Sequence, residues 1–597
     1  MFRKLFTMLL LMLVGLSMSL FGRDIKEAKV HKLTLQEEAN WTENLKNLGA
    51  YTPAPVNNKR GQVELGRTFY DYATNNQMGR MVAQSANGIH FAFMKILPDG
   101  AERHVTYDYF DNAGALFFGN QSVDESLGRT GWGRVFNGKN DEALVTFHGS
   151  GIHLYSDVSE AGYTFSSKLS VTEFAAFVNA TRNGDTVIFL TYRDNDSLFV
   201  STDYMATWTS GNPFQFKDSL VTDDGTSETP PSINPTNTSE FSYVLVPDAT
   251  VLDPNGSTIM ITSSDLGSSF TTTRISGDDD TFINGADSLT YIIENFGQVN
   301  SMYSSNGNFN VVIGAVQGFD QNSAIIDRFP ILYWNSSAQE FVRVSSEAAS
   351  HPADTTTATN LAGFRPGNGL GNAYPHIAEG PSGELVMVWQ QWEDDGAGGL
   401  VTVVGAGGAE VFMTDIWAST SGDGGATWSE PLWIAGTPGE SDVFPNLPEN
   451  LRENATGDSL IVDLLYFNDT NPGVSLFTGG NDPSEGIWYY ERVAIERPVT
   501  GIEDASTVKI GDFALAQNYP NPFNPSTKIE YSLKKASDVT LEIYNVVGQK
   551  VAVLVNERKP AGLYEVNFDA SNLSSGLYFY TLKSGDVNLT RKMMLLK

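Results

Sequence analysis

Short apolar runs separated by turn residues fill the middle of the chain. From about residue 61 to residue 495, runs rich in Val, Ile, Phe, Tyr and Trp alternate with Gly, Asn and Asp. Examples are GIHFAFMKIL (88–97), DSLFVSTD (196–203), STIMITSSD (257–265) and GELVMVWQQW (383–392). This pattern predicts consecutive strands and hairpins. In residues 385–390 both alternating faces are apolar, so we expect that strand to be buried on both sides.

The N-terminus has a different pattern. Arg3 and Lys4 precede an apolar run from Leu5 to Leu16, and small residues follow before the polar Arg23. This order predicts a secretory signal peptide over residues 1–22. The alternative is a membrane anchor, but the apolar stretch from Leu5 to Phe21 is 17 residues long, and a span needs about 20.

Changes in composition divide the rest of the chain. Residues 23–60 are a charged lead-in, 61–495 the strand-rich body, 496–512 a polar linker and 513–597 a second module. A length of 597 residues allows about two to four domains. The second module holds 10 Lys and Arg against 7 Asp and Glu, whereas the whole chain carries a net charge of −32. The opposite signs indicate a module with a separate task.

Composition also excludes several classes of function. The chain has no cysteine, which excludes a disulfide framework, a cysteine-ligated zinc and a thiolate nucleophile. Because nucleic acids and anionic membranes select for Lys and Arg, the strongly acidic balance argues against both as partners. The 56 Gly and 25 Pro, with many Ser, Thr, Asn and Asp, favour a turn-rich all-β chain.

A short motif recurs in the body. The pattern S-x-D-x-G-x-x-W is complete in the segment 421–428, has Phe in place of Trp in 263–270, and has Met in place of Gly in 201–208. Tyr155-Ser156-Asp157 with Thr164-Phe165 is a fourth copy with a longer loop. The Asp can accept backbone N–H bonds in a tight turn, Gly allows positive φ, and the aromatic side chain packs into the core. The motif residues are Ser201, Asp203, Trp208, Ser263, Asp265, Gly267, Phe270, Ser421, Asp423, Gly425 and Trp428.

These segments resemble the Asp box, or BNR repeat, of sialidase-like β-propellers. The resemblance implies that each box joins the last two strands of a blade, on the face away from the ligand site, and is structural. The expected fold is therefore all-β, with a six- or seven-bladed β-propeller followed by a small Ig-like antiparallel sandwich. Segments 333–344, 374–392 and 486–495 are expected to belong to blades that lack the box.

A catalytic site is less evident. Sialidases need three arginines, a Tyr–Glu pair and an Asp, and the body has Arg103, Arg193, Arg328, Arg365 and Arg452. The family's F/Y-R-I-P signature is absent, since its nearest match is DRFP at 327–330. The sequence contains no HExxH, no G-x-S-x-G and no phosphate loop. His148 and His153 are interpreted as turn residues.

One acidic stretch lies beside tryptophan. Glu393, Asp394 and Asp395 follow Trp392, and carboxylates beside indole rings suit sugar binding. A solvated loop also explains this stretch and is the favoured interpretation. We take Arg365, Trp392 and Glu393 as candidate binding residues. Asp278–Asp280 and Asp223–Asp224 could hold Ca²⁺ but lack the alternating D-x-D-x-D spacing, so no cofactor is expected.

The last 85 residues carry the most specific strings. They include YPNPFNP at 519–525, IYNVVGQKV at 543–551, SSGLY at 574–578 and the basic RKM at 591–593, with strand-like runs between them. This module resembles the type A C-terminal sorting domain of the type IX secretion system. The matching positions are Asn518, Pro520, Asn521, Pro522, Phe523, Asn524, Pro525, Gly548, Gly576, Arg591 and Lys592.

The resemblance implies a route and a location. A signal peptide would take the chain to the periplasm, and the tail would be recognised by the outer-membrane machinery, so the protein is expected to be secreted or on the cell surface without a stable membrane span. The favoured function is binding of an extracellular glycan or protein. A sialidase-like glycoside hydrolase and a structural coat or filament subunit remain alternatives.

Overall fold

The computed structural model of the 597-residue chain consists almost entirely of β-strands. It describes residues 62–70, 79–97, 103–114, 116, 119, 121–172, 177–192, 197–211, 227–246, 257–277, 281–284, 287–293, 299–317, 330–345, 372–393, 401–404, 410–437, 439–469, 484–498, 514–515, 518, 523–533, 537–545, 549–560, 562–584 and 587–595. The predicted signal peptide, the lead-in and most of the linker lie outside these residues. The chain forms two compact units, Met1–Pro498 and Val499–Lys597.

Seven main antiparallel sheets make up the described part of the first unit, and the first three follow each other along the chain. Sheet 1 contains β2 (Val82–Gln84), β3 (Gly88–Lys95), β4 (His104–Asp111) and β5 (Gln121–Ser122). A 3-10 helix, η1 (Glu125–Leu127), leads into sheet 2, which contains β6 (Gly131–Asn137), β7 (Ala143–His148), β8 (Ile152–Asp157) and β9 (Phe165–Val171). Sheet 3 contains β10 (Phe177–Asn183), β11 (Thr186–Tyr192), β12 (Leu198–Ser201) and β13 (Thr209–Gly211).

Sheets 4 and 5 carry additional short strands. Sheet 4 contains β14 (Ser227–Glu228), β15 (Ser232–Ile233), β16 (Phe241–Val246), β17 (Ser257–Ser263) and β18 (Thr271–Gly277). Sheet 5 contains β21 (Val299–Tyr303), β22 (Phe309–Gln317), β23 (Ile331–Asn335) and β24 (Val342–Arg343), extended by the hairpin β19 (Thr281–Asn284) and β20 (Asp287–Ile293).

Sheets 6 and 7 complete the ring. Sheet 6 contains β25 (Ala373–Glu379), β26 (Leu385–Trp392), β29 (Thr414–Ser421) and β30 (Leu432–Ala435), with a separate hairpin of β27 (Thr402–Val404) and β28 (Glu410–Phe412). Sheet 7 contains β31 (Ser441–Asn446), β32 (Arg452–Glu453), β33 (Ser459–Asp469) and β34 (Gly486–Glu496). Its outermost strand is β1 (Val63–Thr68), from the other end of the unit, which pairs antiparallel with β34.

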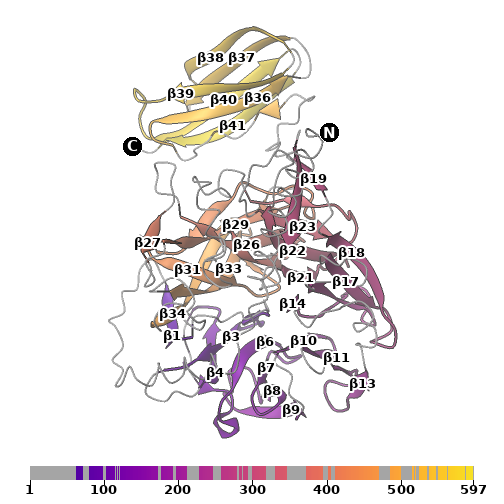
Figure 1. Ribbon diagram of the computed structural model, residues 1–597. Coiled ribbons are helices and arrows are strands. Elements are labelled where there is room, and N and C mark those ends of the chain that lie inside the picture. Colours follow the sequence, from indigo (N-terminus) through magenta and orange to yellow (C-terminus); the bar gives the residue numbers. More distant parts are fainter. Residues whose placement is uncertain are drawn as a thin grey trace, which may run out of the picture. The chain divides into compact units, whose positions relative to one another are not determined.

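The sheets are the blades of a β-propeller. Figure 1 shows them following one another around a ring, from indigo to orange. Each sheet packs face to face on the next, and a separate apolar cluster fills each of the seven interfaces. Because a blade is covered on both faces, its central strands are apolar on both faces. Strand β26 is buried at every position, which confirms the prediction for residues 385–390.

In sheets 1, 2, 3 and 6 the strand that comes first in the chain lies innermost; for example, β6 contacts β2 and β10, and β25 contacts β21 and β31. The direction of the innermost strands defines two faces of the propeller. Each innermost strand begins at one face, which we call the start face, and there the second strand ends and the third begins. The turns between third and fourth strands lie at the opposite face, which we call the turn face. The segment 374–392 forms β25 and β26, in the same sheet as the motif at 421–428. The prediction that it belongs to a blade without the box is therefore wrong.

The second unit is a β-sandwich. One sheet contains β35 (Ala514–Leu515), β36 (Ser526–Leu533) and β39 (Gly562–Asp569), and the other contains β38 (Lys550–Lys559), β37 (Ser537–Asn545), β40 (Gly576–Ser584) and β41 (Val587–Leu595). One apolar cluster that includes Ile529, Leu541 and Tyr580 lies between them. The described residues thus form seven strands, and the predicted Ig-like sandwich is confirmed. No helix in the described part of the chain has the length and hydropathy to cross a membrane.

Candidate ligand-binding face

Hydrogen bonds made by one Ser and one Asp side chain organise each motif turn. In sheet 3, Ser201 Oγ donates to Asp203 Oδ1 at 2.8 Å and accepts from the Met205 N–H at 2.8 Å. Asp203 also accepts from the Thr207 N–H and hydroxyl, at 2.9 and 2.6 Å. These bonds, first of all that from the Thr207 hydroxyl, lower the pKa of Asp203 to about 2. Among the described residues, the hydrogen-bond donors to the Asp203 carboxylate all lie within its own turn.

The same network recurs in two other sheets. Asp265 accepts from Ser263 and from the Ser269 N–H and hydroxyl, at 2.9, 2.8 and 2.6 Å. Asp423 accepts from Ser421 and from the Thr427 N–H and hydroxyl, at 2.8, 2.9 and 2.6 Å. All these turns join the third and fourth strands of their sheets. The hydroxyl residue four positions after the Asp is part of the motif and did not figure in the sequence pattern.

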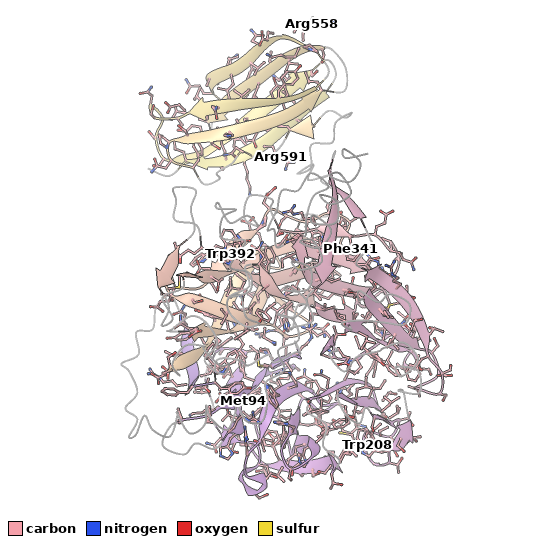
Figure 2. The ribbon with its side chains drawn as sticks, in the orientation of Figure 1. Met94, Trp208, Phe341, Trp392, Arg558 and Arg591 are labelled. Atoms are coloured by element: carbon pink, nitrogen blue, oxygen red, sulfur yellow. The ribbon has the colours of Figure 1, made fainter. Side chains whose placement is uncertain are left out.

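The aromatic residue after each turn anchors it to the rest of the propeller. Trp428 is buried, donates from Nε1 to the Gly425 carbonyl at 3.1 Å, and packs 5.1 Å from the ring of Tyr333 in sheet 5. Phe270 packs edge-on against Phe241. Trp208, labelled in Figure 2, donates to the Lys168 carbonyl of sheet 2 at 3.2 Å. In the fourth copy, Asp157 accepts the N–H groups of Val158, Tyr163 and Thr164 between β8 and β9.

The candidate binding residues from the sequence do not form one site in the described residues. Trp392 is 3% exposed and packs with Tyr374 and Phe444 in the cluster between sheets 6, 7 and 1 (Figure 2), so its ring does not present an open face for a sugar. Glu393 Oε2 accepts from the Gly439 N–H at 3.0 Å. Arg365 lies outside the described residues, as do Arg193 and Arg328.

Arg452 has a structural partner instead. Its Nη2 lies 2.7 Å from Asp463 Oδ2, and Arg492 Nε lies 2.7 Å from Asp463 Oδ1. Arg452 is in the segment between the first and second strands of sheet 7, at the turn face. It therefore cannot join an arginine cluster on the start face, the face opposite the motif turns.

Side chains from four segments converge at the start face near sheets 1 and 2. We call Tyr70, Arg103, Trp132 and His148 the arginine–aromatic cluster. Arg103 lies just before β4, and its guanidinium carbon is 4.4 Å from the Trp132 ring centroid and 5.8 Å from that of Tyr70. Arg103 Nη2 lies 2.8 Å from His148 Nε2, and the His148 and Trp132 ring centroids are 4.3 Å apart.

Arg103 determines the protonation of His148. Because a guanidinium can only donate, His148 Nε2 is the acceptor, and its hydrogen resides on Nδ1. Burial, then the positive Arg103, lowers the pKa of His148 well below its usual value. In the described residues Nδ1 has no hydrogen-bond partner, although His148 is 7% exposed. The imidazole is a neutral, buried donor.

A missing side chain makes this contact possible. A Cβ on Gly131 would lie 2.8 Å from Arg103 Nε and 2.9 Å from His148 Nε2. Only glycine leaves room for the two groups to meet above the start of β6. His148 is the last residue of β7, and His153 lies inside β8; both are buried. The interpretation of both as turn residues is wrong, because the turn between the strands is Gly149–Gly151.

The innermost strands start with a repeated irregularity. Trp132, Tyr374 and Phe444 have φ of 49°, 52° and 56°, and each lies in a register shift against the second strand. Positive φ is uncommon for bulky residues. In each of these three strands a Gly or Pro follows the aromatic residue. The next residue is polar and is buried at the centre of the ring: Arg134, His376 and Asn446.

Polar residues of different sheets meet at the propeller axis, and we call them the axial cluster. Asn446 Nδ2 lies 3.2 Å from His376 Nε2 and donates to the Gly79 carbonyl at 3.1 Å. Arg80 donates to the carbonyls of Ile377 and Leu447 at 2.8 and 3.1 Å. The cluster comprises Arg80, Arg134, His376 and Asn446, from sheets 1, 2, 6 and 7.

Buried carboxyl groups elsewhere on the start face are bound within the protein. Asp442 accepts from the Thr437 N–H at 2.6 Å and from Asn468 Nδ2 at 3.0 Å, and burial raises its pKa well above the usual value. In the part of the chain that the structure describes, no three His, Asp or Glu side chains are placed to hold a metal ion. Asp223–Asp224 and Asp278–Asp280 lie outside it.

In the second unit, several sorting-signal positions are structural. Asn518 is buried. Its N–H donates to the Tyr580 hydroxyl at 2.7 Å, and its Nδ2 donates to Thr527 Oγ1 at 2.9 Å. Phe523 is buried, while Asn524 and Pro525 are exposed. Arg591 Nε donates to the Leu515 carbonyl at 3.1 Å (Figure 2). Gly576 has a φ of 152°, and Lys592 lies in β41. Pro520, Asn521, Pro522 and Gly548 lie outside the described residues.

Comparison with known proteins identifies the second unit. Residues 517–596 match the family model described as "Secretion system C-terminal sorting domain". The chain is therefore exported by type IX secretion, to the cell surface or the medium. A search of curated proteins gave no match.

Solved structures with a similar arrangement are β-propeller proteins. They include an α-L-arabinanase of Penicillium chrysogenum complexed with arabinobiose (13% identity, 60% of this chain and 92% of that chain, TM-score 0.32). YCF48 from Cyanidioschyzon merolae has 12% identity over 72% and 99% of the two chains, with a TM-score of 0.32. An α-L-arabinofuranosidase of Fusarium graminearum with an iminosugar inhibitor has 13% identity over 61% and 97%, with a TM-score of 0.34. These values do not transfer an activity.

Proposed function

We propose that this exported chain is an extracellular binding protein whose propeller binds a glycan at the start face, through the arginine–aromatic cluster. The observation that carries the proposal is the position of Arg103, stacked on Trp132 at 4.4 Å and hydrogen-bonded to His148 at 2.8 Å. A guanidinium fixed on two sides loses little freedom when it binds, so its hydrogen bonds to a ligand cost little ordering entropy.

The chemistry of the cluster suits sugars. Tyr70 and Trp132 are themselves buried, so their rings position Arg103 and do not present an open face. The Arg103 guanidinium and the His148 Nδ1–H are donors, as sugar hydroxyl oxygens require. The motif turns with their satisfied carboxylates lie at the opposite face and keep the hairpins in place. That division supports the start face as the binding face and the turn face as structural.

A glycan array with the purified protein tests the proposal. We expect binding to one class of glycan. Arg103→Ala removes the stacked donor and should raise the Kd at least about tenfold. Arg103→Lys should lose most of the affinity as well, because an ammonium keeps the charge but not the planar donor set. Fluorogenic glycosides run in parallel should show no turnover.

Lys139→Ala is the matched control. Lys139 also places a cation over an aromatic ring, 4.8 Å from Tyr204, but it is exposed and lies at the turn face. Its substitution should leave glycan binding unchanged. Equal losses for Arg103→Ala and Lys139→Ala would contradict the proposed face. Turnover of a glycoside would replace binding by hydrolysis, and absence of any glycan signal would favour a protein ligand or a structural role.

A further inference from the structure

In the axial cluster, the surrounding hydrogen bonds determine which ring nitrogen of His376 carries the hydrogen. Asn446 Oδ1 accepts from the Met81 N–H at 2.8 Å, and its Nδ2 donates to the Gly79 carbonyl. These two backbone contacts fix which end of the amide is the nitrogen. Since Nδ2 then faces His376 Nε2 at 3.2 Å, Nε2 must accept, and the hydrogen of His376 is on Nδ1.

That hydrogen is buried without an acceptor in the described residues. His376 is 0% exposed, and its Nδ1 has no hydrogen-bond partner there. A buried donor left in this state costs about 1–3 kcal/mol, so such groups usually face a water or a ligand atom. Its partner would have to be an acceptor.

The surroundings of His376 are positively charged. Burial, then the charges of Arg80 and Arg134, lowers the pKa of His376 well below its usual value. Both guanidiniums are therefore close enough to act on the imidazole. Burial also lowers the pKa of both arginines.

Among the residues that the structure describes, Arg80 donates its hydrogen bonds to carbonyl groups only. Its two partners are the carbonyls of Ile377, next to His376, and Leu447, next to Asn446. No carboxylate in the described residues lies within 4.0 Å of its guanidinium, and Glu449 acts on it only at longer range. Arg80 is half-buried, whereas the other members of the cluster are buried.

We propose that the axial cluster binds one small anion, which accepts the hydrogen of His376 Nδ1 and is held by the charges of Arg80 and Arg134. The burial of His376, Arg134 and Asn446 restricts the site to a halide or a single oxyanion group. That group is either a free inorganic anion or the carboxylate of a compound small enough to be enclosed. This site is separate from the arginine–aromatic cluster and does not depend on the ligand proposed there.

Thermal unfolding at constant ionic strength tests the site in solution. Gluconate, which is too large for a buried site, is exchanged stepwise for chloride, bromide or formate. An anion that binds only the folded chain raises Tm in a saturable manner. The halides probe a free inorganic anion, and formate probes a carboxylate. We expect a saturable rise with at least one of the three.

Two arginine variants show whether the effect arises at the axis. Arg80→Met removes the charge at similar volume and should abolish the saturable rise. Arg182→Met is the matched control, because Arg182 also donates to two carbonyls, those of Asn137 and Gly184, at the turn-face end of β10. It should retain the rise. An equal effect in both variants would overturn the proposal.

Crystals of the unmodified protein give a test that does not depend on a variant folding. Bromide exchanged for chloride should give an anomalous peak within hydrogen-bond distance of His376 Nδ1, and formate should give density in the same place. If none of the three anions raises Tm saturably and neither bromide nor formate occupies this position, the proposal is wrong.

Discussion

His90 is held neutral inside sheet 1 by two neighbours. Its Nε2 lies 3.0 Å from the Asp141 carbonyl oxygen, which can only accept, and its Nδ1 lies 2.7 Å from the Tyr107 hydroxyl. The first contact assigns the hydrogen to Nε2, and the second makes Nδ1 the acceptor of the Tyr107 hydroxyl hydrogen. Burial lowers the pKa of His90 from 6.5 to about 4. Protonation would remove an acceptor and place a charge in the core.

This predicts a loss of stability in acid. The unfolded chain takes up the His90 proton at about pH 6.5 and the folded chain only near pH 4. The contribution of His90 is therefore full above pH 6.5 and is lost as the pH falls from 6.5 to 4. His90→Gln keeps a donor for Asp141 but has no titrating group. Urea unfolding at pH 5 and pH 7.5 should show a smaller difference between the two pH values in the variant.

The size and direction of the His90 contribution to pH-dependent stability distinguish it from the contributions of other titrating groups. The window of about 2.5 pH units corresponds to at most about 3 kcal/mol for one histidine. Asp442 acts in the opposite direction, because its raised pKa makes the folded chain take up a proton first on acidification. An unchanged pH dependence in His90→Gln would show that other groups determine the acid behaviour.

At the scale of the elements, Asp463 ties the strands of sheet 7 together. It lies on β33, is 0% exposed, and binds Arg452 on β32 and both Tyr490 and Arg492 on β34. Its charge is balanced by two guanidiniums that reach it from neighbouring strands. Removing one partner of a buried ion pair leaves an uncompensated charge, which costs far more than the intact pair contributes.

Asp463→Asn is therefore expected to lower the free energy of unfolding by about 3 kcal/mol or more. Asp185→Asn is the control, because the Lys139–Asp185 pair is also 2.7 Å long but has exposed side chains. Its loss should cost less than about 1 kcal/mol. Urea unfolding midpoints of the two variants and the parent measure both. Similar costs would show that the ion pairs of Asp463 stabilise the protein no more than the exposed Lys139–Asp185 pair does.

The elements also show what the sequence could predict. Strand β26 was predictable because two apolar faces leave only a buried strand, and the motif turns were predictable because Ser, Asp and the aromatic residue lie within eight positions. The arginine–aromatic cluster was not, since Arg103, Trp132 and His148 are far apart in sequence and meet only through the packing of sheets 1 and 2. The axial cluster had one local signal, an aromatic residue, Gly or Pro, then a polar residue. Its three copies share too few identical residues to be found as a repeat.

At the scale of the whole molecule, the propeller is closed by its own two ends. Strand β1 pairs with β34, so the ring is completed by residues about 420 positions apart. Side chains reinforce this closure: Arg67 binds Glu485 at 3.1 Å, and Gln62 donates to the Tyr466 hydroxyl at 2.6 Å. Sheets 1 to 6, in contrast, are each formed by strands that follow one another in the chain.

A disulfide across this closure should stabilise the protein more than one within a sheet. Arg67 and Ile487 are paired in register between β1 and β34, and Ile152 and Val171 are paired between β8 and β9. Opposed antiparallel residues have Cα separations that a disulfide can span. The chain has no other cysteine, so Arg67→Cys with Ile487→Cys can form only the intended bond, as can Ile152→Cys with Val171→Cys.

Comparing the oxidised and reduced forms of each variant cancels the cost of the substitutions. The first bond closes a loop of about 420 residues and the second one of about 19. If loop-closure entropy in the unfolded chain dominates, oxidation should therefore stabilise the first variant by about 3 kcal/mol more. The difference in Tm between oxidised and reduced protein measures this. A gain no larger than that of the Ile152–Val171 bond would mean that the ends of the ring stay associated when the rest unfolds, because a closure that persists in the unfolded chain has no entropy left to lose.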